Sequence, residues 1–320
     1  LFPRTVFPVL PTSIPWFSTL ILALAYWLAA QFSISFATLP EIASTPVWIG
    51  AGVAVGGIAV GRPGIVWGVF VSVWWLEYQY FEGWTLPGFF LALFVTIVVT
   101  LGKWGAARLI QCLAATPARA GSEVTQAGLT AVHSCLDRPK TVLRFVLWGA
   151  FLSHAPGGFL CASLICAFGR SPWSAFPTIG LTWWLSDAFG ILMVTPLILA
   201  WSSPIRSTLL LFRRRWLEMI GLVLGVAFIS LLAFTSRYPL EYMLMPLILW
   251  AAFRFRQPGA TLLMVGGEIV ALVGTAQGHG SFGRESLNES LLLIQSFIGV
   301  IGLTTLLVGA ILHQNEVAEH

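Results

Sequence analysis

The sequence predicts an all-α protein, a polytopic bundle of about ten transmembrane helices. Apolar residues make up 57% of the 320-residue chain and charged residues only 9%, against roughly 25% charged residues in soluble domains. The apolar residues gather in ten segments, most of them close to the length of about 20 residues that crosses a bilayer. Basic residues alternate from side to side of these segments. A soluble fold of this length could not bury so much apolar surface, so lipid is the expected solvent.

Each predicted span is an apolar run bounded by polar, Gly-rich or Pro-rich sequence. In chain order the spans are expected at residues 14–36, 47–61, 63–81, 86–110, 141–168, 176–201, 216–235, 239–255, 259–277 and 289–312. The second and eighth are short and are expected to tilt or to be partly broken, and the count falls to eight if such pieces do not cross. In the second span, Gly52-x-x-x-Gly56 favours close helix packing.

Tight turns and one kink divide the longer apolar stretches. Gly61-Arg62-Pro63-Gly64 and Arg256-Gln257-Pro258-Gly259 each separate a short span from a longer one. Pro fixes one backbone angle of such a turn and Gly permits the other. Within the fifth span, Pro156-Gly157-Gly158 is expected to kink the helix and to release backbone carbonyls.

The basic residues predict the orientation, because cytoplasmic loops of membrane proteins carry an excess of Lys and Arg. Both termini are expected in the cytoplasm, which places 14 of the 17 Lys and Arg residues inside. These are Arg4, Arg62, Lys103, Arg108, Arg119, Arg138, Lys140, Arg144, Arg206, Arg213, Arg214, Arg215, Arg254 and Arg256. As loop residues they are interpreted as topology signals, and no nucleic-acid partner is expected.

The outer loops carry glutamates and aromatic residues, among them Glu77, Trp75 and Tyr78. Trp and Tyr concentrate at membrane interfaces because their rings are apolar and their tips polar. A box of aromatic rings closed by glutamates could instead bind a cation. Both interpretations stay open, and Trp75 and Tyr78 are kept as candidate ligand-binding residues.

Three ionisable residues are predicted near the middle of the membrane: His154, Asp187 and Glu268. A charge at the bilayer centre costs about 3 kcal/mol on insertion scales, so such residues usually face the bundle interior. Either they are hydrogen-bonded and only fix the packing, or they line a polar pocket that senses a proton, a cation or a small solute.

Three further residues are predicted beside this interior. Trp183 and Trp184 lie within one helical turn of Asp187, and Gln295 could hydrogen-bond from the last span. Gln295 is interpreted as a packing residue unless a partner is found. The sequence contains no zinc-ligand spacing, phosphate loop or nucleophile motif, so neither a metal, a cofactor nor catalysis is expected of this chain.

Several motifs in order resemble the MASE1 integral membrane sensor domain. The most specific is Trp183-Trp184-Leu185-Ser186-Asp187-Ala188-Phe189-Gly190, followed by Thr195-Pro196-Leu197-Ile198-Leu199-Ala200-Trp201. Other pieces are Trp48 with Gly52, Gly149-Ala150-Phe151-Leu152-Ser153, the stretch 246–255 and Gly278-His279-Gly280-Ser281-Phe282. Ser186 departs from the family's usual Gly, Ile49 from its frequent Pro, and Pro156-Gly157-Gly158 is unusual for the fifth span.

The resemblance implies an N-terminal sensory input domain of a bacterial histidine kinase or cyclic-di-GMP enzyme. Residues 1–312 would form the sensor in the inner membrane, and residues 313–320 would begin a linker to a cytoplasmic output domain that carries any catalysis. The expected partners are lipid, an unknown small ligand or membrane protein, and a second copy of the chain joined through the last helix and the output domain. A small-solute transporter, or its substrate-binding subunit, and a membrane scaffold without a ligand are the alternatives.

Overall fold

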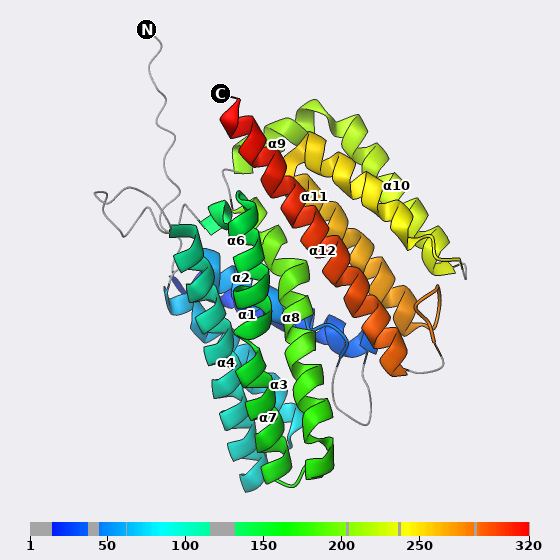
Figure 1. Ribbon diagram of the computed structural model, residues 1–320. Helices are drawn as coiled ribbons and strands as arrows, with labels where there is room; N and C mark the ends of the chain where they lie inside the picture. The colour runs from blue at the N-terminus through cyan, green and yellow to red at the C-terminus, as the bar shows by residue number, and fades with distance from the viewer. Residues whose placement is uncertain are drawn as a thin grey trace.

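The computed structural model describes residues 15–37, 45–61, 63–115, 132–202, 205–235, 238–284 and 287–319. Across these ranges the chain is helical and contains no strand, which confirms the predicted all-α class. Seven helices are long and apolar enough to cross a membrane: 16–35, 86–114, 139–167, 173–201, 216–233, 241–276 and 289–318. Figure 1 shows them as one elongated bundle.

The α-helices are α1 (Pro15–Ala37), α2 (Ile49–Val60), α3 (Val66–Tyr80), α4 (Leu86–Ala115), α6 (Pro139–Arg144), α7 (Ala155–Ala167), α8 (Phe176–Trp201), α9 (Ile205–Arg214), α10 (Trp216–Thr235), α11 (Leu244–Ala276) and α12 (Leu287–Ala318). Shorter turns are η1 (Pro63–Ile65), η2 (Val132–Leu136), η4 (Trp173–Ala175) and η5 (Glu241–Met243), and η3 (Phe145–Leu152) is a π-helix. The predicted segments 47–61 and 63–81 become α2 and α3, which have only 12 and 15 residues.

Helix α2 lies inside the bundle and packs most tightly against α8. A side chain at Gly52 would meet the Gly190 carbonyl oxygen at 2.2 Å, and one at Gly190 would meet the Trp48 carbonyl oxygen at 2.0 Å. The Thr195 hydroxyl donates to the Gly52 carbonyl oxygen at 3.0 Å. These glycines therefore let the two backbones touch, as the spacing of Gly52 and Gly56 predicts.

The chain reverses direction inside the segment assigned to α11. Arg256 adopts φ 57° and ψ −160°, a backbone region that is almost confined to glycine. After this reversal, the Leu244 side chain lies 3.6 Å from the position that a Cβ atom on Gly267 would occupy. Twenty-three residues of straight helix would hold these two positions about 35 Å apart. The reversal falls in the predicted turn Arg256-Gln257-Pro258-Gly259.

Side chains from neighbouring helices hold this turn in place. The Gln257 amide nitrogen donates to the carbonyl oxygens of Leu136 and Leu306, each at 3.2 Å. The Trp201 indole nitrogen donates to the Pro258 carbonyl oxygen at 3.1 Å. The turn therefore binds α8, η2 and α12 together at one end of the bundle.

The two ends of the bundle differ in charge. The end of α4, the start of α6, α9, the α11 turn and the end of α12 meet at one end (Figure 1), which carries most of the described basic residues. At the opposite end Arg170 pairs with Glu82 at 2.9 Å. Arg4, Arg62, Arg119 and Arg237 lie outside the described residues. The predicted separation of basic residues thus holds for the described ones, with one exception, Lys103.

Candidate functional site

An ion pair lies in the middle of the bundle, between α4 and α8. The Lys103 ammonium nitrogen lies 3.2 Å from Asp187 Oδ2, and the two side chains are 1% and 22% exposed. Lys103 falls within the predicted span 86–110 but was counted among the cytoplasmic loop residues that set the orientation, and that interpretation is wrong. Helix α4 continues for twelve residues beyond Lys103, to Ala115, so the lysine lies inside the bundle.

The ion pair borders a cavity of about 150 Å³. The cavity is lined by Tyr26, Ile34, Thr45, Trp48, Leu76, Glu77, Tyr80, Val99, Lys103, Trp183, Ser186 and Asp187. Glu77 also departs from its assignment to an outer loop. It lies on the last turn of α3 and faces the same cavity as Asp187, within electrostatic range of Lys103. Two acidic side chains and one basic side chain thus share a single hollow.

A non-helical segment, Thr45–Trp48, forms part of the cavity wall. Such backbone is tolerated at membrane depth only where its polar groups find partners or line a cavity. Here the Trp48 amide donates to the Ser186 carbonyl oxygen at 2.9 Å. The Gln295 amide nitrogen donates to the Pro46 carbonyl oxygen at 2.8 Å. Gln295 thus has a packing partner and ties α12 to the cavity wall.

Hydroxyl groups and aromatic rings make up much of the remaining wall. The Trp48 indole nitrogen donates to the Tyr26 hydroxyl at 3.1 Å, and the Thr45 and Ser186 hydroxyls lie 3.3 Å apart. The indole nitrogen of Trp183 is buried and has no hydrogen-bond partner among the described residues. A polar solute in the cavity could therefore accept a hydrogen bond from Trp183.

His154 lies beside the cavity but does not line it. Its ring nitrogen Nδ1 lies 2.9 Å from the Ser153 hydroxyl, and Nε2 is buried with no partner in the described ranges. Lys103 and Asp187 are close enough to act electrostatically on the ring. His154 lies two residues after the end of the π-helix η3, and π-type turns inside helices are frequent at functional sites.

The structure does not bring Glu268 together with Asp187. Glu268 is fully buried in α11, and neither carboxylate oxygen has a hydrogen-bond partner in the part of the chain described. Val226 and Ser230 of α10 lie near the neighbouring Gly267. The common pocket expected from the sequence therefore contains Asp187 and Trp183 without Glu268.

The remaining predicted residues, Trp184, Trp75 and Tyr78, lie outside the cavity. The Trp184 indole nitrogen donates to the Phe151 carbonyl oxygen at 2.8 Å, which connects α8 to the π-helix. Trp75 is 52% exposed on the outside of the bundle. Tyr78 packs against Gly83 and the ring of Trp74. None of these three side chains lines the cavity.

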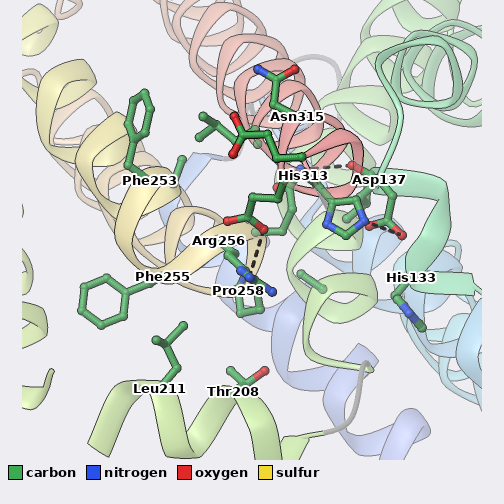
Figure 2. A pocket seen from close by; sticks show the side chains of 18 residues that line it. His133, Asp137, Thr208, Leu211, Phe253, Phe255, Arg256, Pro258, His313 and Asn315 are labelled. Carbon is green, nitrogen blue, oxygen red and sulfur yellow. Dashed lines mark hydrogen bonds and ion pairs between the residues drawn. The ribbon is translucent and has the colours of Figure 1, made fainter. Parts of the chain in front are cut away.

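A second hollow, of about 470 Å³, lies at the basic end of the bundle, where α12 ends (Figure 2). Arg256 pairs with Glu316 at 2.9 Å, and His313 lies 3.9 Å from Asp137. Burial raises the pKa of Asp137, and the nearby His313, His133 and Arg138 partly offset this effect. The end of α12 is thus held to the α11 turn and to η2 by polar contacts.

The intramembrane cavity presents groups that can bind a polar or charged solute. It offers two carboxylates, one ammonium group, hydroxyls and indoles, and among the described residues no three His, Cys, Asp or Glu side chains are placed to hold a metal. A family model described as MASE1 matches residues 18–316. No curated protein and no solved structure matches the chain.

Proposed function

The chain belongs to the MASE1 family of membrane-associated sensor domains, and we propose that it is the sensory input domain of a bacterial signal-transduction protein. Its output domain would be a histidine kinase or a cyclic-di-GMP enzyme and would carry the catalytic activity. Two copies of the protein would form a dimer through the last helix and the output domain. The observation that carries the proposal is the cavity beside Lys103 and Asp187, since buried ionisable groups in a membrane are expensive to keep without a role.

We place the domain in the inner membrane with ten spans, and we place both chain termini in the cytoplasm. The seven long helices include α11, which reverses at Arg256 and so supplies two spans. Helices α2 and α3 supply two more. The basic end of the bundle would then face the cytoplasm, and the cavity, which extends to Tyr80 at the end of α3, would open toward the periplasm.

The proposed mechanism is a population shift between two arrangements of the helices. A ligand shifts such an equilibrium only if it binds one arrangement more tightly than the other. A ligand beside Asp187 would act on α8, whose Phe189 and Leu192 lie against Gly299 and Gly302 of α12. The Gln295 hydrogen bond provides a second connection between the cavity wall and α12.

Movement of α12 would be detected at its cytoplasmic end. There the contacts of Glu316 with Arg256 and of His313 with Asp137 hold the helix around the second hollow (Figure 2). Exposed ion pairs of this kind are worth only about 0–1 kcal/mol. These ion pairs could therefore break and re-form at a small cost in free energy when α12 shifts. The displacement of α12 would then reach the output dimer.

The test is signalling by the full-length protein. We expect Asp187→Asn to change the response to the inducing condition, because it removes a charge from the cavity wall. Glu268→Gln is the matched control, since it also neutralises a buried acid but lies outside the cavity. A normal response from a folded Asp187→Asn protein would contradict the proposal, as would an equal loss in both variants.

A small-solute transporter is a second candidate, and the broken segment Thr45–Trp48 favours it. Transporters bind solutes near the bilayer midplane between discontinuous helices. Uptake of a solute into proteoliposomes that contain only this chain would support the transporter. Signalling that depends on Asp187 without any solute uptake would support the sensor.

A further inference from the structure

The cavity is lined by two acidic side chains, Glu77 and Asp187, and by one basic side chain, Lys103. Lys103 makes one ion pair, with Asp187, and the carboxylate of Glu77 faces the same space without an ion-pair partner among the described residues. A cation that entered beside Glu77 would complete a set of two positive and two negative charges. An anion would instead add a second uncompensated negative charge in a medium of low dielectric constant.

The walls suit an organic cation better than a bare metal ion. Four of the lining side chains are aromatic: Tyr26, Trp48, Tyr80 and Trp183. Aromatic faces attract ammonium groups, and aromatic cages are a recurrent way to recognise quaternary ammonium ligands. A bare cation such as Ca²⁺ requires about six to eight oxygen ligands, and Lys103 places a positive charge where some of them would have to be.

The size of the cavity limits the ligand to a few heavy atoms. A cavity of about 150 Å³ is large enough to hold benzene, which has six. A small ammonium ion with methyl or short alkyl substituents is of comparable size. Its alkyl groups would contact Leu76 and Val99, and its charge would lie near Glu77 and Asp187.

We propose that the intramembrane cavity binds a small organic ammonium ion, which pairs with Glu77 and Asp187 and contacts the rings of Trp48 and Trp183. This inference rests on the proposed sensory function and names the chemical class of its ligand. Lys103 would hold the Asp187 side chain in place through their ion pair, and Glu77 would supply the charge that the ligand neutralises.

The test is binding of choline to the purified chain in nanodiscs, measured by isothermal titration calorimetry and by tryptophan fluorescence. The control ligand is 3,3-dimethyl-1-butanol, which has the same shape with a carbon atom in place of the charged nitrogen. We expect choline to bind at least about tenfold more tightly than the alcohol. Titration with sodium chloride at equal ionic strength corrects for general salt effects.

Variants separate the cavity from the rest of the protein. Glu77→Gln keeps the Lys103–Asp187 ion pair, and therefore the fold, and is expected to weaken choline binding by about tenfold or more. Glu268→Gln should bind choline as the wild type does. Equal binding of choline and the alcohol, absence of choline binding to the folded wild type, or unchanged binding by Glu77→Gln would each overturn the inference. If any of these results were found while Asp187→Asn still altered signalling, the ligand class would be wrong and the sensory function would stand.

Discussion

Replacement of Lys103 by methionine is expected to destabilise the bundle by about 3 kcal/mol, because it removes one partner of an interior ion pair. Methionine fills a similar volume without charge, so the main consequence is that Asp187 loses its partner at 3.2 Å. Asp187 must then either keep an unpaired charge beside the cavity or take up a proton. The loss is measured as a lower unfolding midpoint of the purified protein in detergent.

A double-mutant cycle identifies the ion pair as the cause. Asp187→Asn combined with Lys103→Met leaves no unpaired charge, so the double variant should be more stable than the sum of the single effects predicts, by about 1–3 kcal/mol. Lys140→Met is the matched control, since Lys140 is exposed; its effect should stay within about 0.5 kcal/mol. Strict additivity of the two interior substitutions would show that Lys103 and Asp187 do not stabilise each other.

Replacement of Gly190 by alanine is expected to destabilise the bundle by about 2–3 kcal/mol, because overpacking forces the helix backbones apart. The new methyl group would lie 2.0 Å from the carbonyl oxygen of Trp48. A backbone atom cannot turn away as a side chain can, so α2 must move away from α8. The hydrogen bond from the Trp48 amide to Ser186 would lengthen, and the cavity wall would shift with it.

Gly266→Ala provides the comparison, measured by the same unfolding midpoints. Gly266 is an exposed helical glycine with open space around it. Alanine there should be neutral or stabilising by up to about 1 kcal/mol, because alanine has the higher helix propensity. Equal stability of the Gly190 and Gly266 variants would contradict the close contact between α2 and α8.

The sequence was sufficient to predict the membrane bundle, the reversal at the α11 turn and the close packing of α2. Each of these depends on local chemistry: apolar length, a Pro-Gly turn and glycine spacing. The face of α8 that includes Trp183 and Asp187 was also predictable from helical periodicity. Local patterns of this kind do not depend on which helices become neighbours.

Lys103 was misassigned because a basic residue near the end of a predicted span is ordinarily a topology signal. A signal against that interpretation was present: the apolar pattern continues beyond it through Ala106, Ala107 and Ile110, all of which are buried. A lysine that is followed by two more helical turns with buried residues on one face lies inside a span.

The periodicity of α3 likewise contained a signal for Glu77. Val69 and Val73 are buried on one face, and Glu77 follows four residues later on that face. The separation of Glu268 from Asp187 had no such signal. Periodicity shows which face of a helix is buried but not which helix covers it, and that arrangement depends on the packing of α10, α11 and α12 around α8.

Cysteine accessibility provides the most direct test of the proposed cavity, which opens toward the periplasm, is lined by Glu77 and is not lined by Glu268. A membrane-impermeant, positively charged methanethiosulfonate is added to the outside of intact spheroplasts, in a chain whose exposed Cys112 is replaced by serine. The account predicts rapid modification of Glu77→Cys from outside and no modification of Glu268→Cys from either face of the membrane. An unreactive Glu77→Cys, or equal modification of the two positions, would contradict it.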